Sequence, residues 1–102
     1  MNLEKLYEME SKHREEILSL LTETDNMFLR EMCCRFYDAE KNTWKIFNKD
    51  ECNLGPFYDH EGIISNLIRA GIIIHEYGYP YGMSWFSINP EYRTLLRKHH
   101  DI

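Results

Sequence analysis

The order of signals between residues 59 and 97 most constrains what this chain can fold into. Asp59 can accept hydrogen bonds from the first N–H groups of a helix, and Gly71 can end that helix. We therefore predict a helix over residues 59–70. Its apolar residues recur three or four positions apart, so they share one face, which we expect to be buried: Ile63, Ile64, Leu67 and Ile68.

A β-hairpin and a second capped helix are predicted after this helix. Residues 72–74 are isoleucines, whose branched side chains favour a strand, and residues 83–88 (MSWFSI) alternate as a return strand. The intervening YGYPYG contains a proline that cannot donate to a ladder, so it predicts the tip of the hairpin. Residues 89–91 combine a capping asparagine with a proline at the first helical position, which predicts a new helix. The return-strand residues expected to share one side are Phe86 and Ile88.

The first part of the chain predicts two further helices. Residues 2–22 contain neither glycine nor proline, and residues 27–41 follow a polar break in which Asp25 or Asn26 can act as the cap. The first helix either packs on its own domain or pairs with a second copy as a dimerisation helix. Its seam residues alternate by three and four positions: Leu3, Leu6, Glu10, His13, Ile17 and Leu20.

The segment between residues 42 and 58 has no helical period. TWKIF, residues 43–47, predicts a short strand with Trp44 and Ile46 on one side. A short helix over residues 48–54, ended by the glycine and proline that follow, is also predicted.

The composition suits a single domain over residues 1–102. No apolar stretch is long enough for a membrane span, and the N-terminus does not read as a secretory signal, so we expect a cytoplasmic protein. Three cysteines, two of them adjacent, favour free thiols in a reducing compartment over a disulfide framework. They are Cys33, Cys34 and Cys52.

No pattern indicates catalysis or a metal site. The chain has no glycine-rich phosphate loop, serine elbow or HExxH motif. Its cysteines and histidines lack the close paired spacing of zinc ligands. We therefore expect no enzymatic activity, no cofactor and no metal.

Three segments resemble winged helix-turn-helix regulators of the MarR, ArsR and PadR kinds. LIRAGIII (67–74) resembles the end of their recognition helix and the first wing strand, and WFSINPEYRTLL (85–96) resembles the second wing strand and a capped helix. CNLGPF (52–57) is similar to the end of the preceding short helix, whereas Tyr92 stands where many members have glycine. The resemblance covers residues 27–97.

The resemblance implies a mainly helical α+β winged-helix fold with an added N-terminal helix and a C-terminal helix. Residues 27–41 and 48–54 become the first two helices of the motif, and residues 59–70 become the recognition helix. A rival register uses residues 13–22 and 27–40 as the first two helices and treats residues 42–58 as an insertion.

This fold implies a DNA-binding protein, a small transcriptional regulator that recognises double-stranded DNA. In the major groove, Arg69 could pair with guanine, Asn66 with adenine and Glu61 with cytosine. The helix start could contribute a histidine donor and a close approach of backbone to phosphate. Lysines of the middle segment could add phosphate contacts: Lys41, Lys45 and Lys49. The expected DNA-binding residues are His60, Glu61, Gly62, Ser65, Asn66 and Arg69.

The charge distribution keeps other partners open. The net charge is −5, and residues 70–92 contain no lysine or arginine to enter a minor groove. Tyrosines at the hairpin instead suit a protein contact: Tyr77, Tyr79 and Tyr81. Two alternatives to DNA binding follow: a winged helix that mediates protein association, and an acidic inhibitor, for instance of viral type, that occupies another protein's nucleic-acid site.

Overall fold

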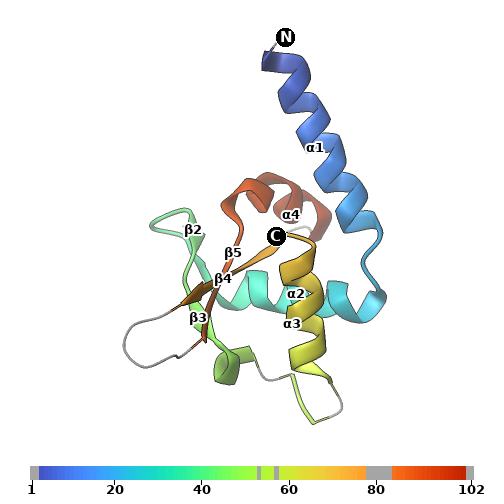
Figure 1. Ribbon diagram of the computed structural model, residues 1–102. Helices are drawn as coiled ribbons and strands as arrows, with labels where there is room; N and C mark the ends of the chain where they lie inside the picture. The colour runs from blue at the N-terminus through green and yellow to red at the C-terminus, as the bar shows by residue number, and fades with distance from the viewer. Residues whose placement is uncertain (1–2, 53, 57, 78–83, 101–102) are drawn as a thin grey trace.

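The computed structural model has an α+β architecture, mainly helical, with two small antiparallel sheets (Figure 1). It describes residues 3–52, 54–56, 58–77 and 84–100. The helices and strands, in chain order, are α1 (Leu3–Ser19), α2 (Glu23–Arg35), β1 (Tyr37–Asp38), β2 (Thr43–Trp44), β3 (Phe47–Asn48), the 3-10 helix η1 (Lys49–Cys52), α3 (His60–Arg69), β4 (Ile73–Tyr77), β5 (Ser84–Ile88), the 3-10 helix η2 (Pro90–Tyr92) and α4 (Arg93–His100).

Helix α2 begins and ends earlier than the sequence predicted. Its cap is Thr22, whose hydroxyl accepts a hydrogen bond from the Asp25 N–H at 3.1 Å. Asp25 therefore lies inside the helix, so the prediction of Asp25 or Asn26 as the cap was wrong. The helix ends at Arg35 instead of residue 41, because residues 37–38 pair as a strand with residues 43–44.

The segment TWKIF forms parts of two strands in two different sheets. Trp44 lies in β2, where it is buried and its indole N–H donates to the Cys33 carbonyl at 3.0 Å. Phe47 begins β3 and pairs with Phe86 of β5. The prediction that Trp44 and Ile46 share one side of a single strand was wrong, because the chain leaves one ladder before joining the next and Ile46 is exposed.

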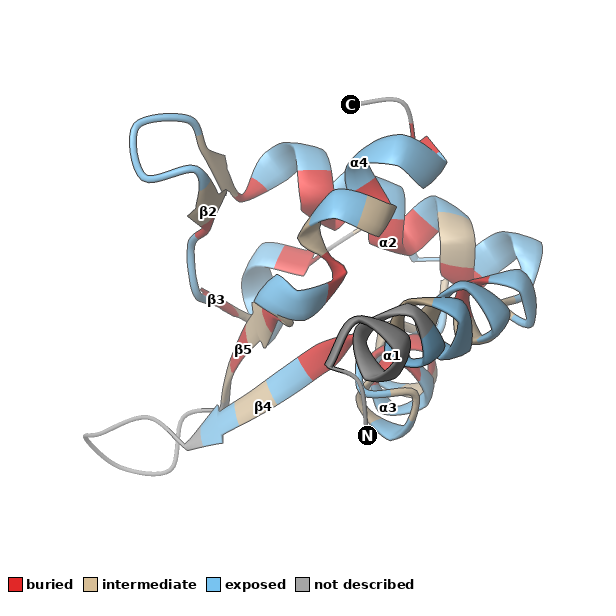
Figure 2. Ribbon diagram, turned by 90° about the horizontal axis from the view of Figure 1, so that it is seen from above, coloured by how far each residue is buried: buried red, intermediate tan, exposed pale blue. Residues whose placement is uncertain are grey.

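The three-stranded sheet has the order β3-β5-β4, so β3, which immediately precedes η1, pairs beside the hairpin. Phe86 and Ile88 are both buried, which confirms the predicted face of the return strand. Helix α3 is confirmed as well: Asp59 caps it, and Ile63, Ile64 and Leu67 are buried. These buried residues belong to one core cluster that also includes Phe28, Leu29 and Met32 of α2. Figure 2 colours the ribbon by burial and shows buried segments along α2.

Helix α1 packs on the domain at its C-terminal end. Leu18 is buried in the core, and Ile17 and Leu21 pack against it partly exposed. Arg14 adds an ion pair of 3.0 Å with Glu91 of η2. The N-terminal part of the helix extends away from the body of the molecule (Figure 1). Among the residues that the structure describes, no helix has the length and apolar character that a membrane span needs.

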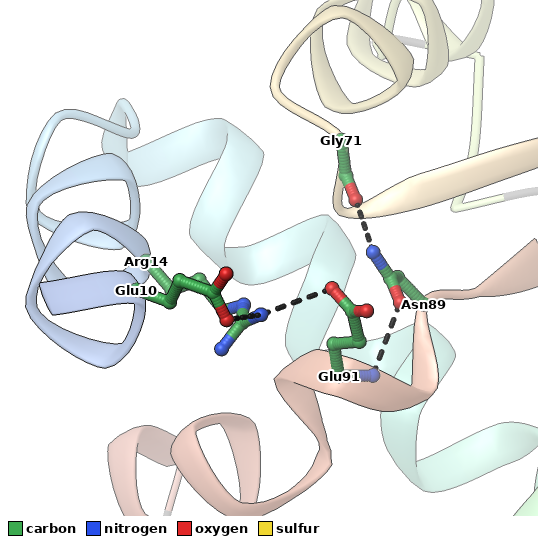
Figure 3. Close-up of polar contacts among 5 residues, drawn as sticks. All are labelled: Glu10, Arg14, Gly71, Asn89 and Glu91. Carbon is green, nitrogen blue, oxygen red and sulfur yellow. Dashed lines mark hydrogen bonds and ion pairs between the residues drawn. The ribbon is translucent and has the colours of Figure 1, made fainter. Parts of the chain in front are cut away.

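Asn89 joins three elements through both ends of its side chain and through its backbone (Figure 3). Its Oδ1 accepts from the Glu91 N–H at 3.0 Å, which caps η2, and its Nδ2 donates to the Gly71 carbonyl at 2.9 Å. Its own N–H donates to the Ile72 carbonyl at 2.8 Å. The positive φ of 77° at Gly71 turns the chain from α3 into β4 at this point. Asn89 thus ties the end of α3 to the start of the C-terminal helices.

We expect Asn89→Ala to destabilise the fold by about 1–2 kcal/mol, because it removes a helix cap and leaves the Gly71 carbonyl without its side-chain donor. Urea unfolding followed by circular dichroism measures this loss. Asn89→Asp is the matched control: it keeps the capping oxygen but loses the amide donor, so its loss should be smaller. Equal stability of all three proteins would contradict this role for Asn89.

The free energy of unfolding should also decrease as the pH is lowered over a defined range, because of His100. Burial, followed by the charges of His99 and Arg30, lowers the pKa of His100 from 6.5 to about 4. Between these values the unfolded chain binds a proton that the folded protein does not, so the free energy of unfolding decreases as pH falls from 6.5 to about 4. Urea titrations at several pH values should show a shallower decrease for His100→Gln than for the unchanged protein. Parallel curves would contradict the assignment.

Candidate nucleic-acid interface

Helix α3 turns one face to the core and the other to solvent. Its exposed residues include Glu61, Ser65, Asn66 and Arg69, four of the six residues predicted to contact DNA. The separation arises from the helical period, since Ile63, Ile64 and Leu67 occupy the opposite side. The structure therefore brings these four polar side chains onto one exposed helix.

Asn66 and Arg69 lie side by side on this face. The Arg69 guanidinium donates to the Asn66 side-chain oxygen at 2.7 Å. The two residues are three positions apart, a spacing that places side chains next to one another on a helix. The two side chains predicted to read bases thus form one connected polar pair. The guanidinium has further N–H groups, and the amide keeps its NH2 group, beyond the ones used in this bond.

Glu61 forms an ion pair with Lys49 of η1 across the start of α3. Both side chains are more than half exposed, so the pair adds little stability. It does place a lysine beside the helix, as the phosphate-contact prediction requires for Lys49. Lys41 and Lys45 are exposed as well.

The imidazole of His60 is occupied by a contact within the chain. Its Nε2 accepts a hydrogen bond from the Leu54 N–H at 2.8 Å, and its ring lies 6.4 Å from those of Phe28 and Tyr58, measured between centroids. Because Nε2 is an acceptor here, the N–H of the neutral ring lies on Nδ1. His60 holds the loop that precedes α3.

Gly62 is required by the helix cap. The Asp59 carboxylate accepts a hydrogen bond from the Gly62 N–H at 3.1 Å, and a Cβ atom added to Gly62 would overlap that carboxylate. The helix cap therefore explains why residue 62 has no side chain. This cause differs from the predicted approach of backbone to phosphate.

The tyrosines predicted at the hairpin are placed only in part. Tyr77 ends β4 and pairs with Ser84. Tyr79 and Tyr81 lie outside the residues that the structure describes.

A hollow of about 310 Å³ separates α3 from η1 and the sheet. The sequence analysis did not find it, because its walls come from three segments far apart in the chain. His75 and Phe86, whose rings stack with centroids 5.2 Å apart, form the sheet side. The complete lining is Lys49, Glu61, Ile64, Ser65, Ile68, His75 and Phe86.

The cysteines differ in exposure as their adjacent positions on a helix require. Cys33 is buried and Cys34 is exposed. Burial and the neighbouring Cys34 raise the pKa of the Cys33 thiol to about 12, and burial raises that of Cys52 to about 11.

Cys34 lines an apolar hollow of about 250 Å³ with Tyr37, Trp44 and Arg97. In the described part of the chain, no three potential metal ligands gather.

The sequence matches no protein-family model, and no curated protein or solved structure matches it significantly.

The overlap at Gly62 predicts a non-additive effect on stability. In an Asp59→Ala background, Gly62→Ala should stabilise the protein by about 0.5–1 kcal/mol, because alanine favours a helix more than glycine does. With Asp59 present, the added methyl group displaces the capping carboxylate, and loss of a cap costs about 0.5–2 kcal/mol. Urea unfolding of the four proteins measures the difference. Equal gains in both backgrounds would show that the cap tolerates a side chain at residue 62.

Proposed function

We propose that this chain is a winged-helix DNA-binding protein, a small transcriptional regulator that places α3 in the major groove. The element order supports the proposal: α2, η1, α3 and the β4–β5 hairpin follow in the order that the family resemblance implies, with the short strands β1, β2 and β3 between α2 and η1. The strand order β3-β5-β4 supports it too, because it brings the early strand beside the hairpin. In this assignment α2, η1 and α3 are the three helices of the motif. The rival register, with residues 13–22 as the first helix, is disfavoured because residues 42–58 contain β2, β3 and η1, and β3 pairs with β5 of the hairpin.

One observation carries the DNA hypothesis: Asn66 and Arg69 form an exposed polar pair one helical turn apart. Arginine can donate two hydrogen bonds to guanine, and asparagine can donate to and accept from adenine. Ser65 lies beside them with a hydroxyl that suits phosphate or base. The exposed face of α3 therefore carries the side-chain types that read base edges.

A second candidate function, protein association, is favoured by the charge of the hairpin. Residues 70–92 contain no lysine or arginine, so this segment offers no cation to a phosphate or a minor groove. The same segment is rich in tyrosine, which anchors protein interfaces. An acidic inhibitor is the version of this function that fits the net charge of −5.

We expect the double variant Asn66→Ala/Arg69→Ala to bind DNA at least about tenfold more weakly, because each base contact contributes about 1–3 kcal/mol of discrimination. Genomic fragments retained by the protein at near-physiological salt and then sequenced supply the target. Titration of that target with each variant measures the affinity. Arg30→Ala, which removes an exposed cation from α2, is the matched control and should bind normally.

Arg69→Lys separates base recognition from attraction to phosphate. It keeps the charge but loses the paired donors of the guanidinium, so sequence discrimination should fall more than non-specific binding. Normal binding by the double variant would show that α3 is not the recognition helix. If the protein retained no DNA motif, the alternative of protein association through the hairpin would be favoured.

A further inference from the structure

The hollow of about 250 Å³ beside Cys34 lies where the end of α2 and the β1–β2 hairpin meet α4. Helix α2 contributes Cys33 and Cys34, the hairpin contributes Tyr37 and Trp44, and α4 contributes Arg97. The lining thus combines two aromatic rings and two cysteines with a single charged side chain. A concave apolar wall with few polar groups is the usual form of a small-molecule site.

The aromatic residues offer this hollow ring surface, because their polar atoms are bound within the chain. The Tyr37 hydroxyl donates to the Asn42 side-chain oxygen at 2.6 Å, and the Trp44 indole N–H donates to the Cys33 carbonyl at 3.0 Å. The two ring planes are inclined at 68°, with centroids 6.4 Å apart, so they form a corner instead of a parallel slot. A slot selects a flat ring, whereas a corner accommodates a flexible aliphatic chain.

Helix α4 supplies positive charge at the same hollow. The Arg97 guanidinium carbon lies over the Tyr37 ring, 5.8 Å from its centroid. One helical turn earlier, Arg93 donates to the Asn42 carbonyl at 2.8 Å, so both arginines of α4 reach the hairpin. The helix sequence, RTLLRKHH, carries three Lys or Arg residues and no acid, although the chain has a net charge of −5. The charge at this hollow therefore complements an anion.

We propose that this hollow binds a medium-chain aliphatic carboxylate, with its chain against Tyr37 and Trp44 and its carboxylate paired with Arg97. A guanidinium has several N–H donors in one plane, and their geometry matches the two oxygens of a carboxylate. Arg97 can therefore bind the carboxylate while its contact with the Tyr37 ring persists. The bound chain also covers the Cys34 thiol, which lines the same hollow. The proposal does not depend on what α3 binds.

Protection of Cys34 tests the proposal on the unchanged protein. Cys34 is exposed, whereas Cys33 and Cys52 are buried, so iodoacetamide should modify Cys34 first. Octanoate at saturation should slow this alkylation at least about tenfold, measured by mass spectrometry, because the reagent then reaches only the small fraction of empty sites. Octanamide has the same chain without the charge and should protect much less. Equal protection by both molecules, or none by octanoate, would overturn the proposal.

A matched pair of variants tests the role of Arg97. Arg97→Gln and Lys98→Gln each remove one positive charge from α4, but Lys98 lines a different hollow, beside α1. In a Trp85→Phe background Trp44 is the remaining tryptophan, so its fluorescence reports titration with octanoate. Arg97→Gln should raise the dissociation constant at least about tenfold, because it removes charge-assisted hydrogen bonds, and Lys98→Gln should leave it unchanged.

Circular dichroism of both variants verifies that the fold is kept. An equal loss of affinity in the two variants would show general attraction to a basic helix, and unchanged affinity in both would show that Arg97 does not bind the carboxylate. Either result would overturn the proposed site. If Arg97→Gln fails to fold, the comparison of octanoate with octanamide on the unchanged protein still decides the question.

Discussion

The side chain of Asn89 fixes where α3 ends relative to the elements that follow it. It binds the Gly71 carbonyl and the Glu91 N–H at once, while its backbone N–H binds the Ile72 carbonyl. The turn out of α3, the end of β5 and the start of η2 therefore meet at one residue. Glu91 extends this connection to α1 through Arg14. The orientation of α3 and the position of the C-terminal end of α1 thus both depend on the segment that contains Asn89 and Glu91.

The side chains on the exposed face of α3 have hydrogen-bond and ion-pair partners within the chain, and these contacts leave the face open to a ligand. Its charged residues already have partners, since Glu61 binds Lys49 and Arg69 binds Asn66. An exposed ion pair contributes at most about 1 kcal/mol, and the Arg69–Asn66 hydrogen bond, whose donor is charged, lies on an exposed face as well. A ligand that offers equivalent hydrogen bonds can therefore replace these contacts at little cost. Until then, the Asn66–Arg69 bond restrains two side chains that would otherwise lose rotamer freedom on binding.

The sequence predicted the second half of this fold better than the first. At the start of α3, at its end and at the start of η2, the chain carries a residue with one clear role, a cap, a glycine or a proline, so local chemistry determined these boundaries. Around Thr22 several capping residues compete, and only packing selects among them, because Asp25 is buried inside α2. The segment around Trp44 and Ile46 is set by pairing with distant strands. The same limit applies to the candidate site, where the partners of His60 and Glu61 come from other segments.

The net charge of the whole chain is a poor guide to what a ligand at α3 would meet. Residues 1–26 carry seven acids and three bases, whereas residues 59–102 carry five and four. Figure 1 shows α1 extending from the side of the molecule opposite the start of α3, in a protein whose longest dimension is 45 Å. Salt screens charges beyond about 8 Å at physiological ionic strength, so most of the acidic excess of α1 acts only locally. The exposed face of α3 carries one acid, Glu61, and one base, Arg69, so it is nearly neutral although the chain has a net charge of −5.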